Sequence, residues 1–160
     1  KGFAPPQWTR GQILYQIFVD RFCPGDGPIA TRDDAVINED WAEGIPQYAR
    51  KRGEPLKNNE FFGGTLWGVI EKLEYLSSLG VGVIYLNPIF RAYSNHKYDT
   101  GDYLEIDGMF GGEEAFRLLV ERAHQMGIRA SRTGGKGPCS WNTGNSGRCI
   151  QPYGRQQPLF

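Results

Sequence analysis

The segment SNHKYDTGDY, which begins at Ser94, gathers side chains that could bind a polar, ring-shaped ligand. His96, Tyr98, Asp99 and Asp102 lie within ten residues, directly after an apolar run that contains Pro88. An aromatic ring can cover the flat apolar face of a sugar, and carboxylates accept hydrogen bonds from its hydroxyl groups. A second interpretation stays open on the residues alone: Tyr98 fills space in a loop, and Asp99 caps that loop or pairs with an arginine.

Cleavage of a glycosidic bond needs two carboxyl groups, roughly 5–5.5 Å apart in retaining enzymes and roughly 6.5–9.5 Å apart in inverting enzymes. We interpret Asp102 and Asp107 as anchors of their loop, and Asp20 as the ion-pair partner of Arg21. No two carboxylates stand out as an acid and a nucleophile, so the sequence assigns no catalytic residue. The carboxylates considered are Asp20, Asp99, Asp102, Glu105 and Asp107.

The elements that must position these residues alternate between strand and helix. Residues 13–22 (ILYQIFVDRF) predict a buried strand, and a loop of about forty residues without sustained periodicity follows it. Apolar residues at helical spacing predict a helix that is capped by Thr65 and ends at Gly80. The run 81–86 (VGVIYL) predicts a strand covered on both faces, as in a parallel sheet.

A second unit follows the SNHKYDTGDY segment. Residues 111–127 predict a helix that carries acids in its first turn and ends at Gly127, and His124 is interpreted as an ordinary residue of this helix. Residues 128–130 (IRA) should open a third strand, but the sequence after Ala130 does not continue it.

The order strand, helix, strand, helix, strand fits a doubly wound sheet or a TIM barrel. A dinucleotide-binding sheet would need three glycines in the pattern GxGxxG after the first strand, and only Gly25 and Gly27 lie there. The long loops follow the strands, whereas the helix-to-strand connections are short. Active sites of barrels lie in the loops after the strands, so we favour a barrel over an α/β dehydrogenase fold.

Composition narrows the function classes. The net charge of zero argues against a dedicated nucleic-acid surface, and no apolar run approaches the roughly 18 residues of a membrane span. Three cysteines without a CxxC pair, together with two histidines, argue against a zinc site. Free thiols and a Cys139–Cys149 disulfide both remain open. The GDG turn around Asp26 could contribute to a calcium loop.

The last thirty residues differ in composition from the rest of the chain. Residues 131–160 hold four Lys or Arg, no Asp or Glu, six Gly and three Pro, so residues 1–130 carry a net charge of −4. Such a segment buries too little apolar area to offset its ordering entropy, and we expect it to be disordered. We therefore divide the chain into a barrel part, 1–130, and a Gly/Pro/Arg-rich tail, 131–160.

In several motifs the chain resembles the start of the catalytic barrel of the α-amylase family, glycoside hydrolase family 13, and most of all its neopullulanase and cyclomaltodextrinase branch. The motifs are LYQIFVDRF, FFGGTLWGVIEKLEYLSSLGVGVIYLNPIF, SNHKYDTGDYLEID and FGGEEAFRLLVERAHQMGIR, which together span about residues 11–129. The resemblance implies a truncated TIM (β/α)8 barrel of about two and a half β/α units with an irregular C-terminal tail.

The resemblance also implies roles for individual residues. The substrates would be α-1,4 and α-1,6 glucans or cyclodextrins, hydrolysed by a retaining mechanism. Tyr98 would stack on the sugar, Asp99 would hold its 4-hydroxyl, and His96 would lie beside them. Members of this branch often bind calcium after the first strand, which would make Asp26 a ligand, although Pro24 replaces the usual Asn and the later acidic pair is displaced to residues 33–34. Intact relatives are often dimers, and we expect no other cofactor and a cytoplasmic location.

The sequence departs from the family after Arg129, where a strand resembling VILDAVFNH should follow and ASRTGGKGPC stands instead. The catalytic carboxylates of the family belong to strands four, five and seven, and no residue here can be assigned their roles. The simplest interpretation is a truncated or frame-shifted product that is poorly stable, prone to aggregate and inactive in glucan hydrolysis, because two strands and part of a third cannot close a barrel. A non-catalytic glucan-binding remnant and a fragment without function remain the alternatives.

Overall fold

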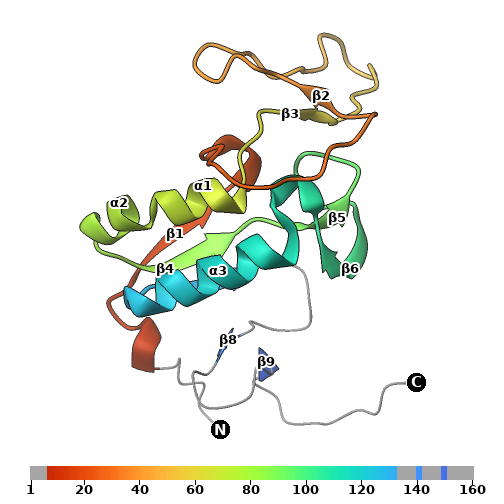
Figure 1. The fold of residues 1–160 in the computed structure, drawn as a ribbon. Coiled ribbons are helices and arrows are strands. Elements are labelled where there is room, and N and C mark those ends of the chain that lie inside the picture. The colour runs from red at the N-terminus through yellow and green to blue at the C-terminus, as the bar shows by residue number, and fades with distance from the viewer. Residues whose placement is uncertain (1–6, 133–139, 142–148, 151–160) are drawn as a thin grey trace, which may run out of the picture.

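A parallel three-stranded sheet lies at the centre of the fold (Figure 1). The computed structural model describes residues 7–132, 140–141 and 149–150. The strands of the sheet are β1 (Ile13–Ile17), β4 (Val81–Leu86) and β7 (Arg129–Arg132). β4 is the middle strand and pairs in parallel with each of the other two. The predicted parallel α/β order is therefore confirmed for this part of the chain.

Helices connect these strands and pack on the sheet (Figure 1). They are α1 (Leu66–Glu71), α2 (Leu73–Ser78) and α3 (Gly112–Gln125). The apolar stripe of α3 contributes buried Phe116, Leu119 and Val120 to the core that it shares with α1 and β4. Gly80 and Gly127 have positive φ angles, 77° and 75°, and end the helical segments where the sequence predicted.

The first predicted helix is interrupted. The hydroxyl of Thr65 caps α1 by accepting the amide N–H of Gly68 at 3.2 Å, as expected. At Lys72 the backbone leaves helical geometry (φ −94°, ψ 6°), and its amide donates to the carbonyls of both Gly68 and Val69 at 3.2 Å. The apolar spacing continues across this break through buried Leu73 and Leu76, so periodicity alone predicted one helix.

Two strand predictions need correction at their ends. The first strand stops at Ile17 and not at Phe22, because the chain turns there into a short 3-10 helix, η2 (Val19–Arg21). Its first residues are also not buried: Ile13 and Leu14 are 52% and 59% exposed, because β1 is an edge strand of the described sheet. The third strand begins at Arg129 and continues to Arg132, beyond the boundary placed after residue 130.

The loop between β1 and α1 is long and mostly irregular. It contains one pair of two-residue parallel strands, β2 (Val36–Ile37) and β3 (Glu60–Phe61). Glu60 is buried, and its carboxylate accepts hydrogen bonds from the side chain of Asn38 and the backbone of Gln47. The carboxylate of Glu60 thus joins two distant parts of a loop that shows no periodicity in the sequence.

An antiparallel hairpin follows β4 and carries the SNHKYDTGDY segment. It consists of β5 (Phe90–Ala92) and β6 (Thr100–Ile106), and a 3-10 helix, η3 (Gly108–Phe110), leads from it into α3. Near the C-terminus, β8 (Ser140–Trp141) pairs antiparallel with β9 (Cys149–Ile150). The rest of the predicted tail, including the candidate Cys139–Cys149 disulfide, lies outside the residues and side chains that are described. Within the described residues, no helix is long and apolar enough to cross a membrane.

Candidate sugar-binding site

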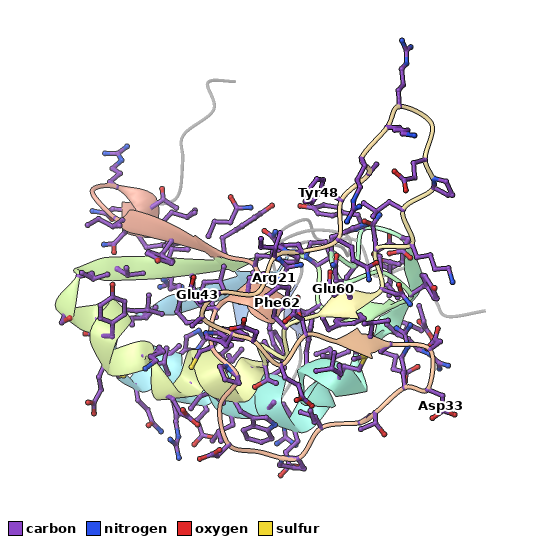
Figure 2. The ribbon with its side chains drawn as sticks, turned by 90° about the horizontal axis from the view of Figure 1, so that it is seen from above. Arg21, Asp33, Glu43, Tyr48, Glu60 and Phe62 are labelled. Atoms are coloured by element: carbon purple, nitrogen blue, oxygen red, sulfur yellow. The ribbon has the colours of Figure 1, made fainter. Side chains whose placement is uncertain are left out.

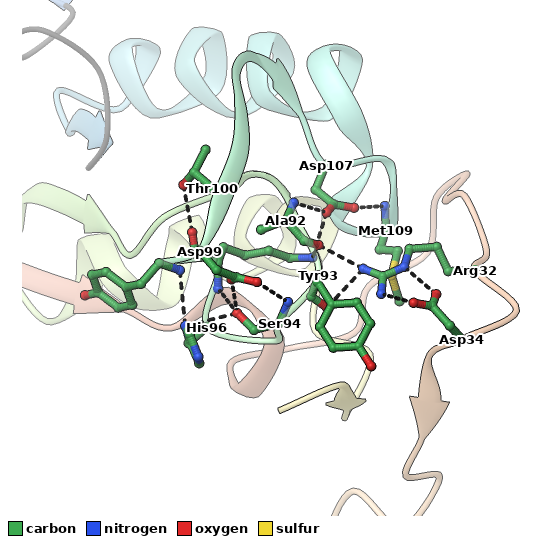
Figure 3. Close-up of polar contacts among 12 residues, drawn as sticks. Arg32, Asp34, Ala92, Tyr93, Ser94, His96, Asp99, Thr100, Asp107 and Met109 are labelled. Carbon is green, nitrogen blue, oxygen red and sulfur yellow. Dashed lines mark hydrogen bonds and ion pairs between the residues drawn. The ribbon is translucent and has the colours of Figure 1, made fainter. Parts of the chain in front are cut away.

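The turn between β5 and β6 presents one aromatic ring to solvent. Tyr98 is 63% exposed, and its ring lies 5.8 Å from the imidazole of half-buried His96, with an angle of 36° between the two planes. Asp99 follows and is exposed as well (Figure 3). The structure thus brings together the three residues that the sequence proposed for substrate binding, and Tyr98 does not fill space in the loop.

Ser94 fixes the carboxylate of Asp99. One carboxylate oxygen accepts the amide N–H of Ser94 at 3.1 Å, and the other accepts its hydroxyl (Figure 3). Burial pushes the pKa of Asp99 up, but the hydrogen bonds from Ser94 outweigh it and hold this pKa below its usual value of 3.8. Asp99 is therefore an ionised acceptor held in one orientation. Its contacts with Ser94 also agree with the second interpretation, in which Asp99 caps the loop.

The hydrogen bonds around His96 determine its tautomer. The backbone N–H of Tyr98 donates to Nδ1 of His96 at 3.1 Å. The hydroxyl oxygen of Ser94 lies 3.0 Å from the same nitrogen, but its proton is donated to Asp99. A backbone N–H can only donate, so Nδ1 must accept and carries no proton. In the neutral ring the proton is then on Nε2, which makes this nitrogen the hydrogen-bond donor that His96 can offer to a ligand.

A buried ion pair lies beneath this turn. Nζ of Lys97 lies 2.6 Å from the carboxylate of Asp107 and donates to the carbonyl of Ala92 at 3.2 Å. The two side chains are 0% and 5% exposed. Burial lowers the pKa of Lys97, and the charge of Asp107 opposes that effect. The sequence predicted Asp107 as a loop anchor, which is confirmed, but gave no sign that Lys97 is its partner, because lysine is almost never fully buried.

The predicted Asp20–Arg21 ion pair is also confirmed. Asp20 is fully buried, and its carboxylate lies 2.8 Å from Nε of Arg21. The guanidinium lies 4.2 Å from the centre of the Phe62 ring, and both labelled residues lie near each other in Figure 2. Burial raises the pKa of Asp20, although Arg21 and the backbone amides of Phe62 and Gly63 oppose this. A carboxylate so enclosed positions backbone and cannot reach a substrate.

The carboxyl ends of β1 and β4 meet beside this pair, as parallel pairing requires. The side chain of Gln16 donates to Oδ1 of Asn87 at 2.6 Å, and the amide of Asn87 donates to the carbonyl of Ile17 at 2.9 Å. These two hydrogen bonds join the end of β4 to β1, at the edge of the sheet from which the long loop and the β5–β6 hairpin both leave.

An open hollow of about 820 Å³ lies between the long loop and the β5–β6 hairpin. Arg32 crosses it, paired with Asp34 at 2.9 Å and donating to the carbonyls of Ala92 and Tyr93 (Figure 3). Asp99 borders the hollow, whereas Tyr98 and His96 do not line it. The exposed ring and the hollow are therefore neighbouring features that share Asp99.

The remaining carboxylates give no catalytic pair among the described residues. Asp102 accepts the amide of Leu104 at 2.7 Å, and Glu105 pairs with Arg91 at 3.0 Å. Each is an exposed group engaged within its own hairpin. Because Asp20 and Asp107 are buried in ion pairs, the described site contains acceptors for a sugar but no recognisable pair of acid and nucleophile.

The calcium hypothesis concerns Asp26, near the start of the long loop. Asp26 is exposed, and its backbone N–H donates to the carboxylate of Glu71 at 2.7 Å. Across residues 7–132, no group of three or more His, Cys, Asp or Glu side chains could hold a metal ion. Backbone carbonyls can also bind calcium, so Asp26 as a ligand stays a prediction.

His124 is a half-buried residue of α3, as interpreted.

Comparison with known proteins identifies the family of this chain. The model of the α-amylase catalytic domain matches residues 16–131, and the chain therefore belongs to the α-amylase family of glycoside hydrolases. A cyclomaltodextrinase of Geobacillus thermopakistaniensis (strain MAS1) is 45% identical over 128 residues, which are 79% of this chain and 19% of that protein. Neopullulanase 2 of Thermoactinomyces vulgaris is 44% identical over 127 residues, which are 79% of this chain and 20% of that protein.

Solved structures agree with the fold. The type III pullulan hydrolase of Thermococcus kodakarensis matches 78% of this chain and 23% of its own chain, with 32% identity and a TM-score of 0.60. The predicted family and branch are thus confirmed, and a truncated barrel fits the match. The chain spans only about a fifth of the length of the cyclomaltodextrinase and neopullulanase relatives.

Proposed function

We propose that residues 94–99 grip one glucose unit of an α-glucan and that these 160 residues alone bind the glucan without hydrolysing it. The observation that carries this proposal is the exposed ring of Tyr98 between a fixed carboxylate, Asp99, and the imidazole of His96. The glucan-acting relatives named above support the choice of an α-glucan as ligand.

Each side chain supplies a different contact. The ring of Tyr98 covers the apolar face of the sugar. The ionised carboxylate of Asp99 accepts from a hydroxyl group, and Nε2–H of His96 donates to another. Because Ser94 and the Tyr98 amide already hold these groups, little side-chain entropy remains to be lost when the sugar binds.

Hydrolysis in the proposed family mechanism is retaining and needs a nucleophile and an acid that flank the bond. Asp20 and Asp107 are buried in ion pairs, and Asp102 and Glu105 are engaged within the hairpin. The intact enzyme would hydrolyse the glucan with carboxylates from other strands of a TIM barrel, of which these residues form about two and a half β/α units. Calcium at Asp26, a dimer and a cytoplasmic location remain predictions.

Isothermal titration with maltotriose tests the proposal. We expect heat of binding with this chain, and a loss of affinity of about tenfold on Tyr98→Ala, the change that corresponds to about 1.4 kcal/mol of lost stacking. Tyr75→Ala is the matched control, since Tyr75 is 53% exposed on α2, away from the turn. Cellotriose, which has β linkages, should give no heat.

Three results would contradict the proposal. Equal affinities for Tyr98→Ala and Tyr75→Ala would remove the ring from the site, and absence of maltotriose binding would favour a fragment without function. Release of reducing sugar from starch or cyclodextrin by this chain alone would show instead that it is an active enzyme.

A further inference from the structure

Lys97 occupies an unusual position in the centre of the proposed site. Among the described residues, only Lys97 and Asn58 are non-glycine residues with positive φ angles, 60° and 55°. A residue with a side chain pays a conformational cost there, which persists only when the surroundings hold it in place. Lys97 stands between His96 and Tyr98, so whatever holds its backbone also determines where their side chains point.

The side chain of Lys97 packs against two aromatic rings and shares the carbonyl of Ala92 as an acceptor with the guanidinium of Arg32. Its ammonium lies 4.8 Å from the centre of the Phe61 ring and 5.1 Å from that of Phe110. A charge in such a place needs a close counter-ion, which the carboxylate of Asp107 supplies at 2.6 Å. Both side chains are buried and paired with each other, although Asp107 borders the hollow.

Asp107 extends this contact to two other segments. One of its oxygens caps η3 by accepting the amide of Met109 at 2.9 Å, and the other accepts the amide of Ala92 at 3.3 Å. The ion pair therefore joins the turn to β5 and to the start of the segment that leads into α3. These elements belong to the packed core, so the turn is attached to the most rigid part of the fold.

The first half of the turn is held by different contacts. The amide of Asn95 donates to the carbonyl of Asn58 at 2.7 Å, and its side chain donates to the carbonyl of Glu60 at 2.8 Å. These bonds do not involve Lys97 or Asp107. Ser94 also holds Asp99 through its amide and hydroxyl, and the Lys97 amide donates to the Ser94 hydroxyl oxygen at 3.1 Å. Loss of the ion pair should therefore loosen residues 96–98, while residues 94–95 and the Asp99 carboxylate stay attached.

We propose that Lys97 is a positioning residue: its buried ion pair with Asp107 holds the turn in the conformation that places the ring of Tyr98 and the imidazole of His96 side by side for the ligand. Lys97 itself does not touch the sugar. The ligand part of this inference rests on the proposed function, whereas the conformational part concerns the free protein and can be tested without any sugar.

The test compares Lys97→Met with the unchanged chain, and Lys72→Met is the control because Lys72 is an exposed lysine between α1 and α2. Amide hydrogen exchange and the imidazole 15N spectrum are recorded without ligand. We expect the Tyr98 amide to exchange at least about tenfold faster in Lys97→Met, because it loses its acceptor on His96. The nitrogen signals of His96 should move, while those of His124 should not.

A second variant distinguishes a role of the ion pair in positioning the turn from a role in folding of the chain. Asp107→Asn combined with Lys97→Met removes the carboxylate that the single change leaves buried without a counter-ion. We expect this double variant to unfold cooperatively yet keep the fast Tyr98 exchange and a maltotriose affinity at least about tenfold below that of the unchanged chain. Wild-type exchange at Tyr98 in either folded variant would overturn the inference, and so would a double variant that fails to fold. If the unchanged chain does not bind maltotriose, the proposed function fails, but the exchange result still decides the role of Lys97.

Discussion

The amide N–H of Phe62 donates to the buried carboxylate of Asp20 at 3.0 Å, and this bond joins the end of β1 to the segment that precedes α1. The neighbouring Phe61 ring covers the ammonium of Lys97. Asp20 therefore supports the proposed site from below, although it lies far from it in the sequence and cannot contact a ligand.

Replacement of Asp20 by Asn should destabilise the chain by about 3 kcal/mol. The carboxylate accepts from Arg21, Phe62 and Gly63, whereas an amide keeps one acceptor oxygen and turns its NH2 group toward one of these donors. Urea unfolding followed by circular dichroism measures the change. Asp33→Asn is the control, because Asp33 is exposed and projects outward at the rim in Figure 2, and it should change stability by less than about 0.5 kcal/mol. Similar unfolding midpoints for the two variants would show that the Asp20 contacts are not needed.

Replacement of His96 by Ala should weaken maltotriose binding by about tenfold, because it removes the Nε2 donor and the acceptor of the Tyr98 amide together. Titration calorimetry at a temperature where the variant is folded gives the ratio of affinities. His124→Ala is a matched control, since the second histidine of the chain lies in α3. An unchanged affinity in His96→Ala would remove this residue from the site.

Acid should reveal the contribution of Asp99 to stability. Its pKa lies below 3.8 in the folded chain, so the ionised group stabilises the fold above pH 3.8, and this stabilisation is lost as the pH falls through the folded pKa. The unchanged chain should therefore lose more unfolding free energy than Asp99→Asn when the pH is lowered from neutral to below 3.8. Urea titrations across this range measure the difference. Parallel curves for the Asp99→Asn variant and the unchanged chain would contradict the assigned role of Ser94 as its donor.

Regular elements could be predicted from the sequence because their signals are local. The apolar run of β4, the cap at Thr65 and the helix stop at Gly127 each depend on neighbouring residues only. The proposal that Tyr98 and Asp99 bind a sugar depended on the family resemblance, since an exposed tyrosine and a loop-filling tyrosine have the same local sequence.

The contacts that hold the site could not be predicted, because they join residues far apart in the chain. The sequence predicts an exposed position for Lys97, like that of most lysines, whereas its side chain lies beside Asp107 and the Phe61 ring. The apolar spacing continues across the interruption at Lys72 and therefore does not predict it. The exposure of Ile13 follows from the edge position of β1, which depends on how the whole sheet is assembled.

The close approach of the long loop to α1 gives a last prediction, at Gly68. A Cβ atom at this position would lie 2.0 Å from the carbonyl oxygen of Cys23, and one at Gly25 would lie 2.2 Å from the amide nitrogen of Gly68. The loop cannot easily retreat, because the same Cys23 carbonyl accepts the amide of Thr65 at 2.9 Å. Both glycines are therefore needed for the loop to cross the start of the helix.

Gly68→Ala should destabilise the chain by about 1–3 kcal/mol, because the steric cost exceeds the gain of about 1 kcal/mol in helix propensity. Ser77→Ala, at an exposed position of α2, should instead stabilise the chain by about 0.5 kcal/mol or less. Urea unfolding of both variants gives the two signs. If Gly68→Ala were as stable as Ser77→Ala, the loop would have to move away from α1 without cost, and the Thr65 contacts with Cys23 and Pro24 would then contribute little to the fold.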